Sequence, residues 1–208
     1  PAVQAASTPE FRAASAVASG TGTTITITKP TGTADNDLLV AVIFSDNATP
    51  TAPSGWTRSS VNDTLVPLSA YELNTYYKIA SSEGATWDWT LSPSSIYEGF
   101  VCAYTGVHAT PAIAASENTS TSNASCTGTS VTTATQNALI ILVGATTSSS
   151  NIVPPGTMTE RVDSSGSLST FLCDEVQGSV GASGNKTATW DGTDNWASHL
   201  LAFKALGT

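Results

Sequence analysis

Residues 37–44 read Asp-Leu-Leu-Val-Ala-Val-Ile-Phe, and this stretch decides the fold class. Every side chain from Leu38 to Phe44 is apolar, which is typical of a central β-strand that is covered on both faces. The run is far shorter than the roughly 20 residues that a membrane-spanning helix needs. Nearby, Thr24-Ile-Thr-Ile-Thr28 alternates strictly, as in a strand with one face towards a core and one towards solvent. We therefore expect an all-β protein without membrane insertion.

The composition also favours strands over helices. Charged residues make up 11% of the 208 residues, well below the usual quarter, and Thr, Ser, Ala and Gly dominate. Helical surfaces normally carry Glu and Lys, whereas β-branched and aromatic side chains pack well on a pleated sheet. The formal net charge is −9, and the seven basic residues form no cluster along the chain. We therefore expect neither nucleic acid nor an anionic membrane surface as a partner.

Five segments of the first half recur in the same order in the second half, which indicates a tandem duplication. The alignment pairs Leu39 with Ile140, Trp56 with Met158, and Tyr104 with Phe203. Each copy reads as short strands separated by turn residues, so we expect an Ig-like or jelly-roll-type β-sandwich made from two tandem pseudo-repeats. The predicted parts are an N-terminal arm at 1–20, a first β repeat at 21–110, and a second β repeat at 111–208 packed with the first.

The sequence shows no recognisable catalytic site. Neither histidine has a nucleophile motif or a carboxylate at a useful spacing, so we interpret His108 and His199 as surface or structural residues. The spacing of the carboxylates singles out no glycosidase pair. The acidic clusters could offer oxygen ligands to calcium, but without the spacing of a recognised loop they favour turn capping; they are Asp35, Asp37, Asp191 and Asp194. We expect no enzyme activity, no cofactor and no metal.

The tryptophans allow two interpretations, since flat aromatic rings can pack in a core or stack on sugars. Trp56 has an apolar counterpart in the second copy, and Trp190 recurs where the first copy has Trp87 or Trp89. A position that is apolar in both copies is explained most simply by packing. We therefore favour core positions over a sugar platform, with Trp196 as the first choice for a sugar contact.

The three cysteines leave one thiol over if a single disulfide forms. Cys102 and Cys173 lie inside apolar segments, and the favoured interpretation is that they are small core residues. The alternative is a disulfide between Cys102 and Cys173, or one that includes Cys126, because the composition resembles that of secreted proteins. For an exported chain, the predicted loops also offer five sequons for glycosylation, at Asn47, Asn62, Asn118, Asn123 and Asn185.

The N-terminal segment of residues 1–20 is apolar but has no helical pattern. One interpretation is that it forms the first strand of its own sandwich. The other is that it is a donor strand, which would complete the sheet of a neighbouring copy through main-chain hydrogen bonds and alternate side chains in pockets. The side chains assigned to that role are Ala2, Val3, Ala5, Phe11, Ala13 and Val17.

Four short stretches resemble a widespread, uncharacterised group of duplicated β-sandwich proteins; they are Pro53-Ser-Gly-Trp56, Tyr76–Ala80, Trp87–Thr90 and Ala103–Val107. Members occur among bacterial secreted proteins and beside phage tail genes. The fold looks like that of extracellular bacterial fibril subunits that polymerise by strand exchange. The resemblance implies a subunit of an extracellular, pilus-like filament whose partner is the protein itself. The alternative is a phage tail or cell-surface accessory domain that binds glycans.

Overall fold

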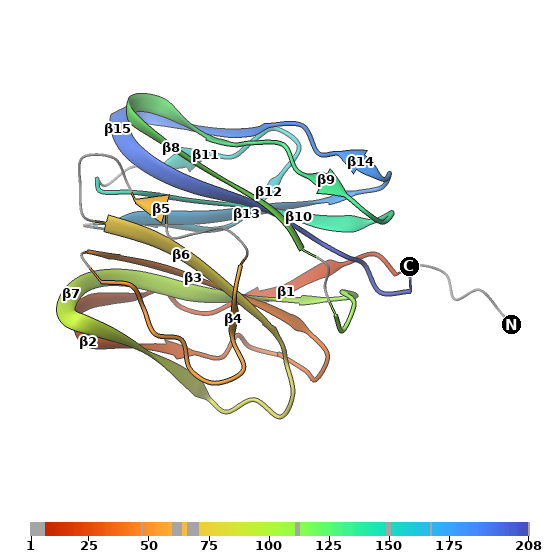
Figure 1. The fold of residues 1–208 in the computed structure, drawn as a ribbon, viewed down its shortest axis with the longest axis horizontal. Coiled ribbons are helices and arrows are strands. Elements are labelled where there is room, and N and C mark those ends of the chain that lie inside the picture. Colours follow the sequence, from red (N-terminus) through yellow and green to blue (C-terminus); the bar gives the residue numbers. More distant parts are fainter. Residues whose placement is uncertain are drawn as a thin grey trace, which may run out of the picture.

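The computed structural model describes residues 7–46, 48–59, 64–65, 71–110, 113–148, 151–166 and 168–207. Within these ranges the fold is all-β, as the sequence predicts. Two antiparallel sheets form a β-sandwich, seen as the lower and upper layers of Figure 1. None of the described residues belongs to a helix that could cross a membrane.

The first half of the chain forms a seven-stranded sheet around β3 (Leu38–Asp46). On one side β3 pairs with β6 (Tyr71–Ile79), and on the other it pairs with β7 (Thr86–Thr105). The strands β4 (Thr57–Arg58) and β5 (Thr64–Leu65) pair with β6, and the strands β1 (Glu10–Ala14) and β2 (Ala18–Thr28) pair with β7.

The second half forms a six-stranded sheet around β10 (Ala138–Thr146). Its neighbours are β13 (Ser169–Gln177) and β15 (Lys186–Phe203). The strand β12 (Thr159–Ser165) pairs with β13, while β11 (Ile152–Val153) and β8 (Ile113–Gly128) pair with β15. Two short strands, β9 (Thr132–Thr133) and β14 (Gly181–Ala182), pair only with each other within the described residues.

The two sheets share one order of strands. The central trio β6-β3-β7 corresponds to β13-β10-β15, and even the register agrees, because Leu38 faces Tyr104 where Leu139 faces Phe203. A shared strand order does not by itself show that one half was copied from the other. The tandem duplication and its boundaries therefore stay predictions.

The run of residues 38–44 is apolar throughout because β3 is covered on both faces. Alternate side chains enter a core between the two sheets, which we call the inner core; they are Leu38, Val40, Val42 and Phe44. The others enter a core inside the first half; they are Leu39, Ala41 and Ile43. That second core is closed by β2 and by the first part of the long strand β7, which bring Ile25, Ile27, Trp87 and Trp89 onto it.

Two polar pairs connect the two sheets across the inner core. Thr170 Oγ1 on β13 donates to the buried Glu98 carboxylate on β7, and Thr75 Oγ1 on β6 lies 2.8 Å from His199 Nδ1 on β15. Burial raises the pKa of Glu98, and hydrogen bonds from Thr170 and Ser164 oppose that shift. Polar groups buried this deeply cost free energy unless they are hydrogen-bonded, so these pairs help to fix how the sheets are aligned.

Candidate functional site

The histidines are not arranged for catalysis. Burial lowers the pKa of His199 to about 3, with a smaller contribution from Arg58, so its ring is neutral at physiological pH. Its Nδ1 faces Thr75 inside the inner core, where solvent does not reach it. His108 lies at the surface, and its Nδ1 accepts from the backbone N–H of Thr110 at 3.0 Å. The structural role predicted for His199 agrees with this position.

Of the acidic residues, Asp37 caps a turn, as the sequence predicts, whereas Asp194 lies inside strand β15. Asp37 Oδ2 accepts from the backbone N–H of Ala34 at 2.8 Å, and Asp35 Oδ1 accepts from that of Ser82 at 2.7 Å. Asp194 Oδ1 accepts from its neighbour Asn195 N at 2.8 Å. In the described part of the chain, no three His, Cys, Asp or Glu side chains gather closely enough to hold a metal ion.

The five tryptophan rings are core residues. Their exposed fractions do not exceed 9%, and Trp196, the first choice for a sugar contact, is 3% exposed. In the first half the rings of Trp56 and Trp89 lie 5.2 Å apart, centroid to centroid, and pack against each other. The prediction of core positions is confirmed, and Trp196 presents no face on which a sugar ring could stack.

The cysteines are free and buried. The alternative interpretation, a Cys102–Cys173 disulfide, is wrong, because Cys102 points into the inner core while Cys173 points into the core of the second half. Burial raises the pKa of Cys173 to about 12, so its thiol stays protonated. Cys126 lies in the same core as Cys173 and is also free. The interpretation as small core residues is confirmed.

The sequons differ in accessibility. Asn123 and Asn185 are exposed, whereas Asn118 is half-buried and its Nδ2 donates to Thr127 O at 3.0 Å. Asn47 and Asn62 lie outside the described residues. Glycosylation therefore stays a prediction, with Asn123 and Asn185 the most accessible of the described acceptors.

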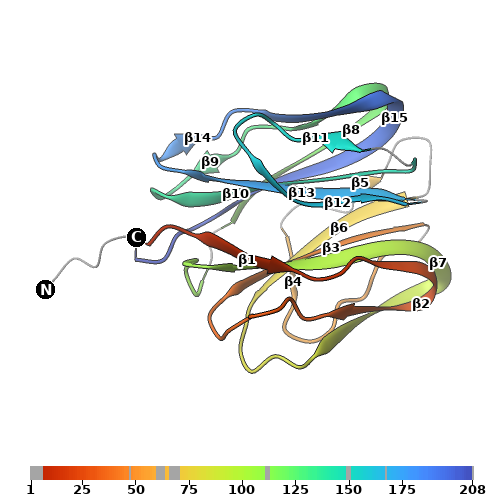
Figure 2. The same ribbon diagram turned by 180° about the vertical axis from the view of Figure 1, so that it is seen from behind.

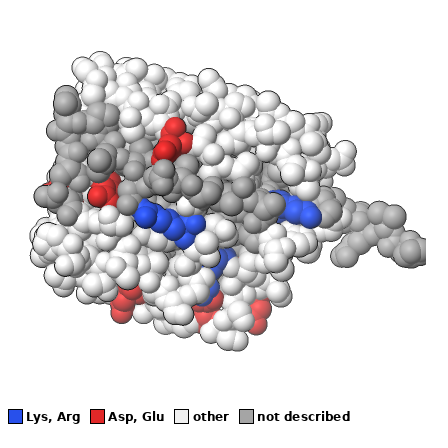
Figure 3. All heavy atoms as spheres, in the orientation of Figure 1, with Lys and Arg blue, Asp and Glu red and all other residues white. Residues whose placement is uncertain are grey.

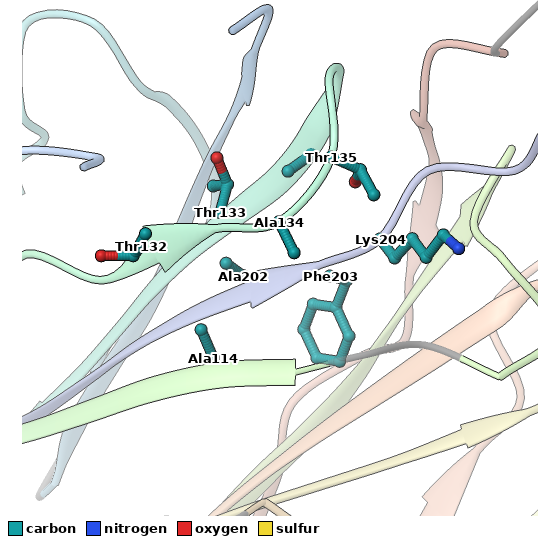
Figure 4. Close-up of a pocket in the computed structure, with 9 residues that line it drawn as sticks. Ala114, Thr132, Thr133, Ala134, Thr135, Ala202, Phe203 and Lys204 are labelled. Atoms are coloured by element: carbon teal, nitrogen blue, oxygen red, sulfur yellow. The ribbon is translucent and has the colours of Figure 1, made fainter. Parts of the chain in front are cut away.

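On the face shown in Figure 3, charged side chains are few and scattered over a mostly uncharged surface. One small hollow of about 80 Å³ lies on the second half, and small side chains line most of it, with Phe203 and Lys204 also contributing (Figure 4). It is lined by alanine and threonine residues around Ala114, Ala134 and Ala202, which cannot form an acid–base pair.

The N-terminal strand β1 is the element that stands apart. Within the described residues it pairs with β7 alone, through Glu10–Ala14 against Cys102–Thr105, and a bulge interrupts the register between Phe11 and Ala13. Its other edge borders an open groove of about 700 Å³ between β1 and the strands β12 and β13. In Figure 2, β1 runs along the near side of the molecule, just below β12 and β13. The strand is therefore short and has one free edge.

One aromatic side chain anchors β1 in what we call the Phe11 socket, formed by Tyr104, Arg161 and Asp174. The rings of Phe11 and Tyr104 meet edge to face with centroids 5.6 Å apart. On the other side, the guanidinium carbon of Arg161 lies 4.5 Å from the Phe11 centroid, within the range of a cation–π contact. Asp174 holds that guanidinium in place by accepting from Nε at 2.8 Å and from a terminal nitrogen at 3.1 Å. The socket thus joins both halves around a side chain of the N-terminal segment.

The link between β1 and β2 is fixed at one residue. Ser15 N donates to Val101 O at 2.8 Å, and Ser15 Oγ accepts from Val101 N at 3.0 Å. After Ser15, two residues outside any strand lead to Ala18, where β2 begins. The link between β1 and β2 is therefore short and outside the strand ladders after Ser15, and we refer to it as the hinge.

The residues assigned to a donor strand fall into two groups. Phe11 and Ala13 lie in β1, and the half-buried Val17 packs against the inner core just before β2. Ala2, Val3 and Ala5 lie outside the described residues. Within one copy, the structure thus has Glu10–Ala14 as a strand of its own sheet, which was the other interpretation of this segment.

The sequence did not reveal the Phe11 socket. Its only trace was Asp174, a carboxylate that follows the apolar run Phe171-Leu-Cys173 on a strand. A charge at the end of such a run signals a paired, buried group, but the sequence does not say that its partner is Arg161 or that both hold Phe11.

No family model matches the chain, and no curated protein or solved structure is significantly similar to it.

Proposed function

We propose that this protein is a structural subunit of an extracellular, pilus-like bacterial filament, in which copies are joined by exchange of the N-terminal strand. The observation that carries the proposal is β1 itself: a terminal strand of five residues, separated by a hinge from the rest of its sheet, with an aromatic anchor in a socket. These are the features that allow a strand to leave one copy and bind another in the same place.

Exchange conserves the contacts of the strand. An arriving β1 from a second copy meets the same edge of β7 and the same Phe11 socket that the resident strand occupies. The free energy of exchange then depends on the strain in the hinge and on the entropy lost when two molecules associate. Exchange therefore becomes more favourable as the protein concentration rises. A copy that donates one strand and receives one extends a chain of copies. If the rotation from one copy to the next does not close into a ring, the chain is a filament.

The acceptor edge is unstable when empty. Without β1, the backbone groups of β7 around Cys102–Thr105 lose their partners, and Tyr104 loses the ring that covers it. Unpaired strand edges bind other strands readily, because each free N–H and C=O gains a hydrogen bond. An empty acceptor edge is therefore a specific binding site for a strand with the sequence of β1.

The test is capture of a synthetic peptide. A chain that lacks residues 1–14 should form no filaments in negative-stain microscopy and should bind a peptide of residues 7–16 with saturation. The matched control peptide carries Phe11→Ala and should bind at least tenfold more weakly, because about 2 kcal/mol of aromatic contact is lost. Filaments formed by the truncated chain would contradict the proposal, and so would equal binding of the two peptides.

A further inference from the structure

The first described residues of the chain are held by its last ones. Ser7 N donates to Leu206 O at 3.0 Å, and Ser7 Oγ donates to Gly106 O at 3.1 Å. Leu206 N in turn donates to Gly106 O at 2.8 Å. Figures 1 and 2 both show the C-terminal end of the chain beside the start of β1. We call this junction the terminal clamp; it consists of Ser7–Pro9, Gly106–His108 and Lys204–Leu206.

The clamp also ties the second half to the first. Val107 and Ala205 form an isolated β-bridge, and His108 N donates to Lys204 O at 3.0 Å. Val107 and Ala205 are both buried. The C-terminal segment thus leaves its own sheet, pairs with the end of the first half, and then covers the beginning of the N-terminal segment.

Gly106 allows the three segments to meet. Its φ is +76°, a conformation that residues with a side chain rarely adopt. A Cβ at this position would lie 2.8 Å from Thr8 O and 3.2 Å from Pro9 Cα, so a side chain here and the N-terminal segment cannot occupy the same space. The close contact of Thr8 and Pro9 with the end of the first half therefore requires a glycine at position 106.

We infer that the terminal clamp is an autoinhibitory latch, which keeps β1 in its own sheet until the C-terminal segment moves away. A five-residue strand with a single neighbouring strand has few ladder bonds, and an unattached segment ahead of it would fray. The clamp prevents this by fixing Ser7 just ahead of β1. Opening the clamp leaves β1 attached through its ladder with β7, through Phe11 and through the ion pair of Arg12 with the buried Asp37. That the released strand then joins another copy rests on the proposed function.

The experiment compares two glycine substitutions by hydrogen exchange of backbone amides in the full chain. Gly106→Ala places a Cβ against Thr8, whereas Gly184→Ala imposes a similar backbone strain, since φ of Gly184 is +69°, with no atom within 4 Å of the new Cβ. We expect Gly106→Ala to speed exchange at the amides of β1 by roughly tenfold or more, because hydrogen bonds of the clamp are lost. Gly184→Ala should leave β1 unchanged, and amides of β8 serve as the internal reference in both variants.

A second variant opens the clamp without strain at Gly106. Leu206→Pro removes the N–H that donates to Gly106 O, and it should also speed exchange in β1 while β8 keeps its protection. If β1 is as protected in Gly106→Ala and Leu206→Pro as in Gly184→Ala, the clamp is not a latch. Filament formation is scored separately by microscopy. If the variants release β1 but do not assemble faster, the inference of a latch holds and the strand-exchange function is contradicted instead.

Discussion

The two halves close the same side of their sheets in different ways. In the second half one strand of 16 residues, β8, pairs with β15 along its length, from Ile113 opposite Phe203 to Gly128 opposite Lys186. In the first half the same position is shared by two strands, β1 and β2, with a break at residues 15–17. Phe11 faces Tyr104 at the register position where Ile113 faces Phe203.

Under the proposed strand exchange, this difference gives the first sheet a strand that can leave without uncovering the first-half core. A continuous strand such as β8 leaves only if its whole ladder opens, whereas β1 can leave while β2 keeps the first-half core covered by Ile25 and Ile27. The break therefore allows β1 to open without opening the ladder between β2 and β7.

The largest effect is expected from removal of the Phe11 socket's cation. Arg161→Ala leaves the buried Asp174 carboxylate without its ion pair, and it should lower the free energy of unfolding by about 2–3 kcal/mol in urea titrations. The matched control is Lys186→Ala, which breaks the pair with Glu175 on the same strand as Asp174. Both variants should be less stable, but only Arg161→Ala should loosen β1. Equal amide protection of β1 in the two variants would show that the Phe11 socket does not hold β1 in place.

A smaller and more local effect is expected from the anchor itself. Phe11→Ala removes the ring contact with Tyr104 and the cation–π contact with Arg161, about 2 kcal/mol together. Because β1 opens by itself, this loss should speed hydrogen exchange in β1 more than tenfold and leave β8 protected. If exchange in β8 speeds up as much as in β1, the substitution loosens the whole protein and β1 does not open by itself.

The smallest effect concerns the inner core, which both halves share. His199 has a pKa of about 3 in the folded chain, below its ordinary value near 6.5, so protons bind the unfolded chain more tightly. Stability due to His199 is complete above the ordinary pKa and is lost as the pH falls towards 3. Between pH 7 and pH 6 we expect a loss of about 0.7 kcal/mol that His199→Gln abolishes. Burial of Glu98, whose pKa is raised, works in the opposite direction, so only the difference between the two proteins isolates His199.

Much of the fold could be predicted from local patterns. The apolar run of residues 38–44 indicated a strand covered on both faces, and β3 has one core on each face. The length of β7, 20 residues, was not evident from local patterns. In the structure a single strand, β7, spans Thr86–Thr105 and pairs with β2 along its first part and with β3 along its last.

The candidate site was less predictable because long-range contacts build it. Phe11, Tyr104 and Arg161 belong to three distant parts of the chain, and no local pattern links them. The alternative interpretation of a Cys102–Cys173 disulfide was wrong for a similar reason. Cys102 and Cys173 both lie in apolar strands, but each strand has two buried faces, and the sequence does not tell which core a side chain enters.

Strand exchange can be measured directly with one substitution. Ala14 stands opposite Cys102 in the β1–β7 ladder, where Cβ atoms of facing residues lie about 4.5–5.5 Å apart, close to the reach of a disulfide. Because Cys102 is a free thiol, Ala14→Cys should form a covalent bond between β1 and the sheet that holds it. The control, Ala14→Cys with Cys102→Ala, should form none.

The decisive readout is a non-reducing gel of the oxidised, assembled Ala14→Cys protein. If β1 is exchanged, each disulfide joins two copies, and the gel should show a ladder of covalent multimers that the control lacks. A single band of monomers with an internal disulfide would show that β1 never leaves its own sheet, and it would contradict the strand-exchange account.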